Sequence, residues 1–424
     1  MSREDVSTSI AIVGAGQAAA RAAQELRTLG HTGAITLIGA EAHRPYERPP
    51  LSKAVLQADG LGATPVLSES VFAELQLELI PGTRVTGLNL AEHQLKLSDQ
   101  RSVHYERCLL ATGGDVRILP ALPPGGRHTH YLRTLDDAQA LRHRLRAGGS
   151  LAVIGGGFLG LEAALSARRA GMTVTVIESA ATLLGRFVPH DLSEWIAASV
   201  VAQGIALHLG QALQSAQATA EGVRLTLQDG APVQSDAVLV AIGLLPQVEL
   251  ARQAGLALDD RDGGIVVAAD GRTSHPDVFA AGDCASQYRP SLGLSARLES
   301  WQNANEQARA AAAGLMDLSP PQAAFPWFWT DLGEHNLQML GLKTADLNYV
   351  HRSQGADTHR GVWLGLRGGV PVHGVALNAG ADLRALRPLL ERQIPIDHRP
   401  FTDPSTKLKA WAQSHLAAPA ASLP

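Results

Sequence analysis

The sequence predicts an α/β protein that combines two Rossmann-like dinucleotide-binding domains with a C-terminal α+β domain. This prediction rests on a pattern of elements that occurs twice and on a change of pattern near the C-terminal part of the chain. A strand, a glycine-rich turn, a helix and a second strand follow one another near the start of the chain, and the same order returns near residue 150. From about Phe325 the pattern changes to short strands followed by one helix, which is typical of a separate α+β unit.

Each repeat is a βαβ unit. The first has its strand, helix and strand at Ile10–Val13, Gln17–Leu29 and Ile35–Ile38. Small and apolar residues recur on one face of this helix at steps of three and four, which predicts close packing against a sheet. The second has a strand at Leu151–Ile154, a helix ending near Ala170 and a strand at Thr173–Ile177.

The remaining predicted elements set the domain limits. Short β segments that end near glycine lie at Cys108–Thr112, Val223–Leu227, Val238–Ile242 and Val278–Ala281. We expect a discontinuous first domain at residues 1–115 and 246–325, a second at 116–245 and the α+β domain at 326–424. In the last domain we expect strands at Leu337–Leu342, Val362–Leu366 and Val370–Leu377, one helix at Ala381–Glu391 and a frayed end at 416–424.

Composition excludes several kinds of partner and chemistry. A net charge of −4 gives no reason to bind nucleic acid, and no apolar run approaches the about 18 residues of a membrane span. We expect no nucleic-acid or membrane partner and a cytoplasmic location. The two cysteines, Cys108 and Cys284, form no C-x-x-C pair, so we expect reduced core thiols. Only His128-x-His130 approaches ligand spacing, without a matching cysteine or carboxylate, so we expect no metal.

Both glycine-rich turns match the dinucleotide fingerprint G-x-G-x-x-G/A. They read Gly14-Ala15-Gly16-Gln17-Ala18-Ala19 and Gly155-Gly156-Gly157-Phe158-Leu159-Gly160. The first glycine makes the tight turn, the second admits a pyrophosphate, and the third small residue packs helix on strand. The phosphates then lie at a helix N-terminus, where free N–H groups favour anions. The sequence therefore predicts two bound dinucleotides.

Glu178 ends the second unit and indicates which nicotinamide nucleotide binds there. A carboxylate in that place accepts hydrogen bonds from the adenosine ribose and repels a 2′-phosphate. No Arg or Lys follows until Arg186, so NADH is expected over NADPH, the alternative being a solvated strand-end glutamate. Two dinucleotides in one chain are usually a hydride donor and a flavin, so we expect FAD in the first domain.

Several sequence blocks stand in an order that is typical of one family. The most specific are Arg44-Pro45-Tyr46-Glu47-Arg48-Pro49-Pro50-Leu51-Ser52-Lys53 and Pro326-Trp327-Phe328-Trp329-Thr330-Asp331. Broader ones are Leu110-Ala111-Thr112-Gly113, Ala281-Gly282-Asp283 and the segment 298–304. Over nearly its whole length the chain therefore resembles the oxygenase-coupled, NADH-dependent ferredoxin reductases. The resemblance implies a glutathione-reductase-like arrangement of the two dinucleotide-binding domains.

The resemblance also implies roles for individual residues. It sets Asp283 on the ribityl chain of FAD and Trp301 against the isoalloxazine, with ordinary core packing as the alternative for Trp301. It sets Phe158, Leu159 and Glu162 on the nicotinamide side. Beside the FAD pyrophosphate, ribose and flavin it sets Gly14, Ala15, Gly16, Ala18, Arg44 and Lys53. The further cofactor contacts that it implies are Ala19, Pro45, Arg48, Val85, Ala111, Thr112, Gly113, Arg133, Gly155, Gly157, Gly160, Arg186, Ile242 and Gly243.

Lys53, Glu162 and Glu41 have further expected roles at FAD. We expect Glu162 to pair with Lys53 beneath the flavin N5, which makes these the candidate catalytic residues. The alternative for Glu162 is a carboxylate that only favours the helix N-terminus. Ala40 stands where the family usually has an acidic residue, and we expect Glu41 to take over the ribose contact.

The C-terminal domain begins with an aromatic cluster, in which Phe325, Trp327, Phe328 and Trp329 fall within five positions. The resemblance places this segment near the flavin and a ferredoxin dock, the alternative being a hydrophobic domain boundary. Residues 326–424 hold 10 Lys+Arg and 8 Asp+Glu, whereas the rest of the chain holds 26 and 32. A relatively positive domain favours an acidic partner.

These predictions together indicate an enzyme that passes electrons from NADH through FAD to a [2Fe–2S] ferredoxin of a Rieske oxygenase or cytochrome P450 system. We expect it to be a monomer or a homodimer. The missing cysteine pair separates it from disulfide reductases. A rubredoxin or monodehydroascorbate reductase remains an alternative, as does a non-enzymatic flavoprotein like apoptosis-inducing factor, although a −4 chain lacks an obvious basic surface.

Overall fold

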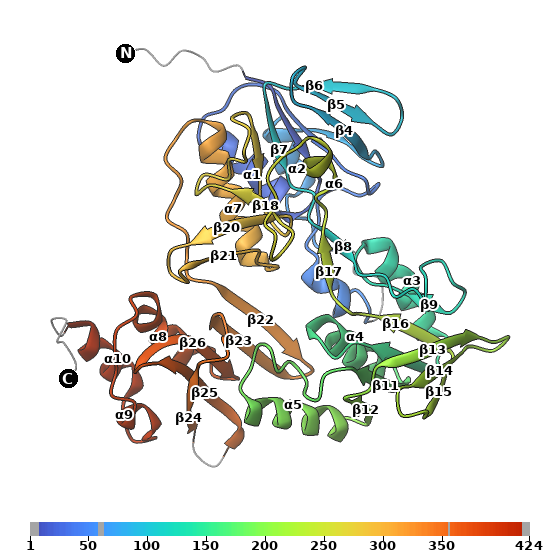
Figure 1. Cartoon of the computed structure of the whole chain (residues 1–424), viewed down its shortest axis with the longest axis vertical. Helices are drawn as coiled ribbons and strands as arrows, with labels where there is room; N and C mark the ends of the chain where they lie inside the picture. The colour runs from blue at the N-terminus through green and yellow to red at the C-terminus, as the bar shows by residue number, and fades with distance from the viewer. Residues whose placement is uncertain (1–7, 58–62, 355–356, 418–424) are drawn as a thin grey trace.

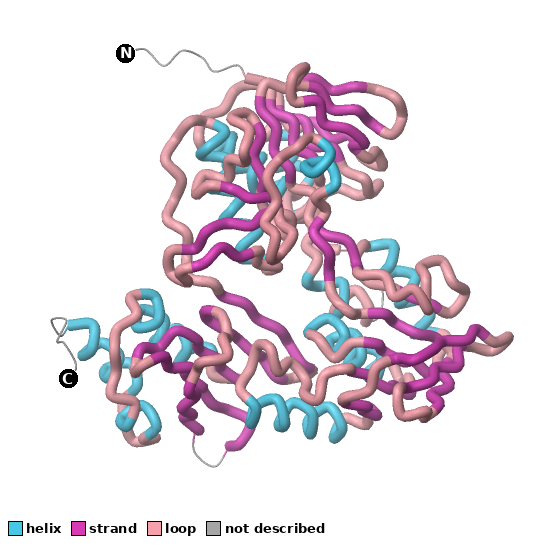
Figure 2. The backbone as a smooth tube through the Cα atoms, viewed as in Figure 1, coloured by secondary structure: helices cyan, strands magenta, loops and turns pink. Residues whose placement is uncertain are grey.

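The computed structural model describes residues 8–57, 63–354 and 357–417. Figure 1 shows that these residues form three bodies, one above and two below, each built around its own sheet. In Figure 2 the strands run through the middle of each body, and helices lie around and between the two lower sheets. None of the helices in these ranges has the length and apolar character that crossing a membrane requires.

The first body is built on a parallel sheet with the strand order β19-β7-β1-β2-β3. On one face α1 (Gln17–Thr28) packs against α7 (Trp301–Leu315) through fully buried alanines and leucines. Such small side chains allow the helices to approach closely. A three-stranded antiparallel sheet and α6 (Glu249–Gln253) cover the other face.

The other elements of this body are short. The sheet strands are β1 (Ile10–Val13), β2 (Ile35–Ile38), β3 (Glu78–Ile80), β7 (Arg107–Leu110) and β19 (Val278–Ala280). The covering strands are β4 (Val85–Asn89), β5 (Gln94–Leu97) and β6 (Ser102–His104). Additional elements are η1 (Pro49–Ser52), α2 (Glu69–Glu74), β18 (Ile265–Val267), β20 (Ala285–Arg289) and β21 (Leu294–Ala296).

Two strands connect the first body to the second. The chain leaves through β8 (Gly114–Val116) and returns through β17 (Leu244–Pro246), and these strands pair in antiparallel fashion. The first body is therefore assembled from two separate parts of the chain. The domain limits expected near residues 115 and 246 fall within this strand pair.

The second body repeats the parallel architecture, with the order β12-β11-β10-β16-β9. Its strands are β9 (Thr129–His130), β10 (Ser150–Ile154), β11 (Thr173–Glu178), β12 (Ile205–Leu209) and β16 (Ala237–Val240). Its helices are α3 (Leu135–Arg146), α4 (Phe158–Arg169) and α5 (His190–Ala202). A small antiparallel sheet of β13 (Leu213–Ala218), β14 (Val223–Leu227) and β15 (Pro232–Ser235) packs beside them.

The third body is an antiparallel sheet with the order β22-β23-β26-β25-β24. Its strands are β22 (Trp327–Leu332), β23 (His335–Gly341), β24 (Asn348–Gln354), β25 (Asp357–Arg367) and β26 (Val370–Leu377). Its helices are α8 (Gly380–Glu391), α9 (Arg399–Thr402) and α10 (Leu408–Ala417). The helices cover one face, and the other face shares a core cluster with α4 and α5 of the second body.

The prediction of one C-terminal helix was wrong, because α9 and α10 follow α8. These segments are short, and neighbouring prolines and aspartates hide their helical character. The expected frayed end begins inside α10, which includes Leu416 and Ala417, and the rest of it lies outside the described residues. The aromatic cluster proves to be mostly strand β22.

Candidate active site

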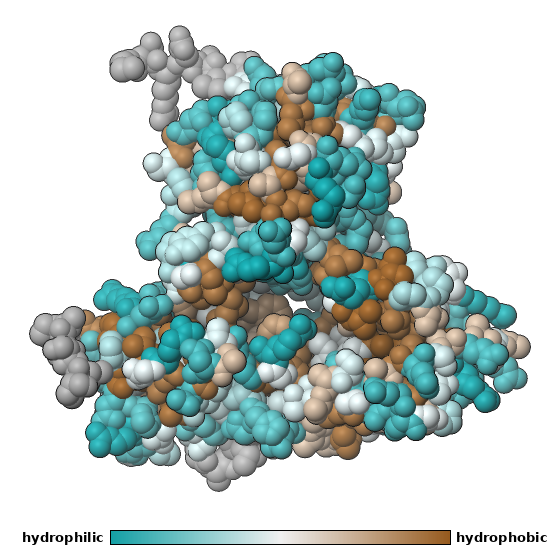
Figure 3. Space-filling model, viewed as in Figure 1, coloured by the Kyte–Doolittle hydropathy of each residue, from teal (hydrophilic) through white to brown (hydrophobic). Residues whose placement is uncertain are grey.

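A connected cavity of about 1850 Å³ lies where the three bodies meet. Figure 3 shows the hollow between the upper body and the two lower ones, with apolar residues gathered around it. Gly14 and Gly155, which follow the carboxyl ends of β1 and β10, both line it. Ligands of open parallel sheets bind at such carboxyl ends.

Both glycine-rich turns lead into helices whose N-termini carry no side-chain cap. Gly16 is the N-cap of α1 and Gly157 the N-cap of α4, and neither helix has an acidic residue in its first turn. A Cβ added to either glycine would meet nothing within 4 Å. By contrast, Thr134 caps α3 and Ser300 caps α7. Two helix ends thus offer N–H donors and space to an anion, which fits the pyrophosphates of two dinucleotides.

The first glycine of each turn is required by its backbone. Gly14 has φ +118° and Gly155 has φ +106°. A Cβ on Gly14 would lie 2.2 Å from the carbonyl oxygen of Ala111, and one on Gly155 would lie 2.3 Å from that of Ala241. Only glycine can occupy both positions without displacing a neighbouring strand.

Glu178 ends β11 at the edge of the cavity. Its Oε2 accepts a hydrogen bond from the Gly156 N–H at 2.6 Å, and its Oε1 accepts one from the Ala180 N–H at 2.7 Å. The carboxylate is therefore fixed beside the second glycine-rich turn. This is the place where a ribose hydroxyl of a dinucleotide bound to α4 would meet it.

Glu41 lines the cavity beside Ala40, and both its carboxylate oxygens already have partners within the protein. Oε1 lies 2.7 Å from Nη2 of Arg48, and Oε2 accepts a hydrogen bond from the Tyr46 hydroxyl. Burial raises the pKa of Tyr46, so this hydroxyl keeps its proton. A ribose contact by Glu41 would have to share the carboxylate with Arg48 and Tyr46.

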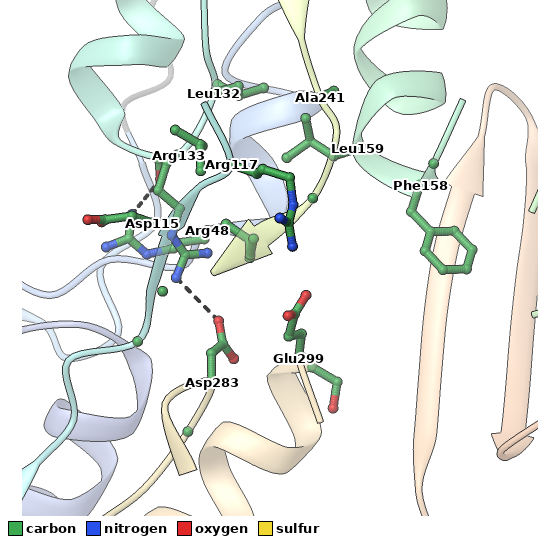
Figure 4. Close-up of a pocket in the computed structure, with 18 of the residues that line it drawn as sticks. Arg48, Asp115, Arg117, Leu132, Arg133, Phe158, Leu159, Ala241, Asp283 and Glu299 are labelled. Carbon is green, nitrogen blue, oxygen red and sulfur yellow. Dashed lines mark hydrogen bonds and ion pairs between the residues drawn. The ribbon is translucent and has the colours of Figure 1, made fainter. Parts of the chain in front are cut away.

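An ion pair between Asp283 and Arg133 joins the first body to the second. Asp283 Oδ2 lies 3.2 Å from Nη2 of Arg133, and Figure 4 shows these side chains pointing toward each other across the cavity wall. The Arg133 carbonyl accepts a hydrogen bond from Arg48 at 2.5 Å. Burial lowers the pKa of Arg133, and the nearby Arg48 lowers it further. Arg297 donates to the Asp283 carbonyl at 3.1 Å and pairs with Glu299 at 2.6 Å.

Lys53 and Glu162 form an ion pair with 2.8 Å between Nζ and Oε1. The Glu162 carboxylate is buried and accepts two more hydrogen bonds, from the Ser52 hydroxyl at 2.5 Å and the Thr330 hydroxyl at 2.5 Å. The donors come from the first and third bodies, and Glu162 from the second. A smaller cavity of about 220 Å³ lies behind the pair, and Lys53 and Glu162 line both cavities.

Aromatic rings line the side of the cavity formed by the third body. Trp301 meets Trp329 edge to face with 5.9 Å between centroids, and Trp329 stacks on Trp327 at 4.8 Å. Phe328 packs on Phe158 at 4.7 Å. Ring pairs at such separations attract each other and give this side of the cavity an apolar surface. Phe325, the first residue of the predicted cluster, lies instead in the core of the third body.

Most predicted site residues come together at the large cavity. Those that line it are Gly14, Ala15, Gly16, Ala18, Glu41, Arg48, Lys53, Val85, Ala111, Thr112, Gly113, Arg133, Gly155, Gly157, Phe158, Leu159, Glu162, Glu178, Arg186, Ile242, Gly243, Asp283 and Trp301.

Four predicted cofactor contacts do not line the cavity. Arg44 pairs with Glu69 at 3.0 Å on the surface, because its side chain turns toward α2 rather than inward. Pro45 is buried, and its carbonyl accepts the Val66 N–H. Ala19 is fully buried in the helix packing of the first body. A Cβ on Gly160 would lie 2.0 Å from the Gly155 carbonyl oxygen, so this glycine serves helix packing.

Neither cysteine lines the cavity. Cys108 and Cys284 are both fully buried, and burial raises the pKa of each thiol. Within the described ranges, no group of three or more His, Cys, Asp or Glu residues could hold a metal ion. His128 Nδ1 instead lies 3.0 Å from the carbonyl oxygen of Asp236.

Sequence reasoning missed several residues of the site. Ser52 and Thr330 stand inside the two most specific sequence blocks, so those blocks were the available signal. Lys343, just after β23, and His373, in β26, also line the cavity, but no motif surrounds either of them. Only the folded sheet brings them there.

Comparison with known proteins gives two matching families. Residues 8–308 match the family "Pyridine nucleotide-disulphide oxidoreductase", and residues 327–412 match "Reductase C-terminal". A Burkholderia cepacia protein, the ferredoxin–NAD(+) reductase component of an anthranilate 1,2-dioxygenase system, is 39% identical over 94% of this chain and 98% of its own.

Solved structures show the same similarity along the whole chain. Putidaredoxin reductase, in its covalent complex with putidaredoxin, matches with a TM-score of 0.91 and 33% identity over 97% of this chain and 99% of its own. A ferredoxin reductase for the CYP199A2 system of Rhodopseudomonas palustris matches with a TM-score of 0.90 and 34% identity, over 96% and 100% of the two chains.

Proposed function

Since the chain belongs to the pyridine nucleotide-disulphide oxidoreductase family, in the branch of the ferredoxin–NAD(+) reductases, we propose that it passes electrons from NADH through FAD to a ferredoxin. One observation carries this proposal. Both glycine-rich turns open into one cavity, and no cysteine is among the described residues that line it. The site therefore suits two dinucleotides without a thiol relay.

The residues fit the two cofactors in distinct places. FAD would lie on the N-terminus of α1, with Asp283 and Arg133 beside its middle part and Trp301 near its ring. NADH would lie on the N-terminus of α4, with Glu178 beside its ribose. When bound, the flavin accepts a hydride from nicotinamide and releases electrons singly.

Around these cofactors the chain would supply charge and an apolar surface. Lys53 would present its positive charge to the flavin, and the ion pair with Glu162 holds its Nζ in place. Both residues of this pair also line the smaller cavity. Apolar rings line the cavity where the second and third bodies meet. They are Phe158 from α4 and Phe328 and Trp329 from β22. The protein thus positions and tunes its cofactors, without a covalent catalyst.

We further propose that the acceptor is a [2Fe–2S] ferredoxin of a Rieske oxygenase or cytochrome P450 system and that the reductase is a monomer or homodimer. The named relatives serve both kinds of system. Residues 326–424 carry 10 Lys+Arg and 8 Asp+Glu, unlike the rest of the chain, and this favours an acidic partner.

The test is cytochrome c reduction by the FAD-loaded protein with NADH and a purified [2Fe–2S] ferredoxin. We expect turnover that depends on ferredoxin and is much slower with NADPH, because Glu178 repels the 2′-phosphate. Rubredoxin and monodehydroascorbate serve as parallel acceptors. Faster turnover with either of them would overturn the ferredoxin assignment, and absence of NADH oxidation with every acceptor would overturn the enzyme assignment.

A further inference from the structure

Lys343 reaches from the third body to a loop of the second. It follows β23, and its Nζ donates to the carbonyl oxygens of Gly185 at 2.7 Å and Val188 at 2.6 Å. These two carbonyls stand on either side of Arg186 and Phe187, which both line the large cavity. One ammonium therefore holds the backbone at both ends of a two-residue segment at the site.

The surroundings of Lys343 strengthen its hydrogen bonds to the loop. Nζ lies 5.9 Å from the centre of the Tyr349 ring, in addition to its two carbonyl partners. Burial lowers the pKa of Lys343, as expected for an ammonium that has exchanged water for fixed dipoles. Hydrogen bonds from a charged donor are about twice as strong as neutral ones.

The side chains of the held segment face the second glycine-rich turn. The Phe187 ring packs on Phe158, the first residue of α4, with 4.8 Å between centroids. The Arg186 guanidinium lies over the Phe187 ring at 5.6 Å. Both side chains are exposed, so packing by itself does little to fix them.

The third body also forms a hydrogen bond to the start of α5, directly after this loop. Asp191, in the first turn of α5, accepts a hydrogen bond from the Trp363 indole at 2.8 Å. The loop between β11 and α5 is thus attached to the end of β11 through Glu178 and to the third body through Lys343, and Trp363 holds the first turn of the helix that follows the loop. Contacts with the third body therefore help to set the conformation of this loop.

We propose that Lys343 is a positioning residue for NADH: it fixes the loop so that Arg186 faces the pyrophosphate at the α4 N-terminus and Phe187 stays on Phe158. This inference rests on the proposed NADH site and adds a specific role for the C-terminal domain. Because the loop is already held in the conformation that binds NADH, binding does not incur the entropy cost of ordering the loop.

The kinetic test uses the FAD-loaded protein. Lys343→Met keeps the alkyl chain and removes the donors. If the released loop adopts the NADH-binding conformation about a tenth of the time, the KM for NADH should rise about tenfold. We expect kcat to change less than about twofold, since the held residues bind the nucleotide rather than react. Lys343→Arg, which keeps the charge, should recover part of the loss. The matched control is Lys409→Met, at an exposed lysine of α10.

A second readout needs no turnover. Trypsin cleaves after arginine in mobile backbone, so Lys343→Met should be cut after Arg186 faster than wild type and Lys409→Met, as identified by fragment mass. Adding NAD+ should slow this cleavage. An unchanged cleavage rate would overturn the role of Lys343 even if the enzyme is an NADH-dependent reductase. An equal fall in kcat and rise in KM would also overturn it. If Lys343→Met does not retain FAD, Lys343→Gln takes its place in both measurements.

Discussion

At the scale of single residues, Glu162 shows how a buried carboxylate can organise a site. Burying a charge is costly unless partners replace its water. Lys53, Ser52 and Thr330 provide three donors, and the Glu162 side chain is only 9% exposed. The sequence block Pro49–Lys53 therefore carries two of the partners that make the buried carboxylate tolerable.

The first prediction concerns the ammonium of this pair. We expect Lys53→Met to slow flavin reduction by NADH about tenfold or more, because a positive charge preset at the reacting ring is lost. FAD content should remain near that of wild type, since the pyrophosphate contacts are elsewhere. Stopped-flow flavin absorbance and flavin content measure the two effects. Lys96→Met, at an exposed lysine of β5, is the control, and equal losses of rate and of FAD would contradict the prediction.

His373 is a second residue whose environment has a measurable consequence. It is buried in β26, and its Nδ1 lies 2.6 Å from the Tyr349 hydroxyl. Burial, assisted by the charge of Lys343, lowers the pKa of His373 to about 3. In the unfolded chain the imidazole has its ordinary pKa of about 6.5. At pH values between about 3 and 6.5, the imidazole therefore binds a proton in the unfolded chain but not in the folded one.

The second prediction follows from this difference. As pH falls from about 6.5 toward 3, the free energy of unfolding should fall by up to about 1.4 kcal/mol per pH unit on account of His373. His373→Phe should be less stable at neutral pH, because Tyr349 loses its partner, yet show a flatter acid slope. Denaturant unfolding at several pH values measures the slope. The exposed His143→Gln serves as control, and a slope in His373→Phe equal to that of wild type would contradict the prediction.

At the scale of elements, the two glycine-rich turns divide the work of folding and binding between their glycines. Gly14 is required by its positive φ and by the nearby Ala111 carbonyl. Gly16 has an ordinary extended backbone with φ −100°, and a Cβ there would meet open space. The first glycine therefore serves the turn, and the second keeps room for the ligand.

The third prediction separates these two roles. Gly16→Val should fold with a stability within about 1 kcal/mol of the wild-type apoprotein, because only the N-cap position changes. It should nevertheless lose most of its FAD, since the side chain fills the space at the helix end. Gly14→Ala should lose about 2 kcal/mol or more of stability through backbone strain and the clash. Flavin content and apoprotein unfolding test both, and retention of FAD by Gly16→Val would contradict the proposed pyrophosphate position.

At the scale of the whole molecule, the second and third bodies share one core. Residues of α4 and α5 and residues of the third sheet, including Leu337, Trp363 and Val375, belong to a single apolar cluster. A continuous core resists relative motion of the two units. The Glu162 carboxylate then links this pair to the first body through Ser52 and Lys53.

The fourth prediction tests this three-body junction. Thr330→Val keeps the shape of a fully buried side chain and removes one donor to Glu162. We expect the holoprotein to lose about 1–3 kcal/mol of unfolding free energy, the cost of leaving a buried acceptor less satisfied. Thr330→Ser, which keeps the hydroxyl, should lose less. Thermal and denaturant unfolding measure the change, and equal stability of Thr330→Val and wild type would contradict the role of the hydroxyl.

Much of this protein was readable from local sequence patterns. The strands Val223–Leu227 and Val370–Leu377 have the predicted bounds, and both βαβ units lie within a few residues of the prediction. Periodicity and glycine placement are local properties, so the sequence reports them directly. The placement of Arg44 outside the cavity was not readable, because it depends on the position of Glu69 in α2.

Local patterns were enough to identify two dinucleotide-binding turns, the carboxylate Glu178 after the second, and two cysteines without a partner motif. Only the tertiary structure decided that Thr330 would join Ser52 and Lys53 on Glu162, and that Lys343 would hold the loop of Arg186 and Phe187. These contacts join residues that are 109 to 168 positions apart along the chain, and no local pattern encodes a partner at that separation.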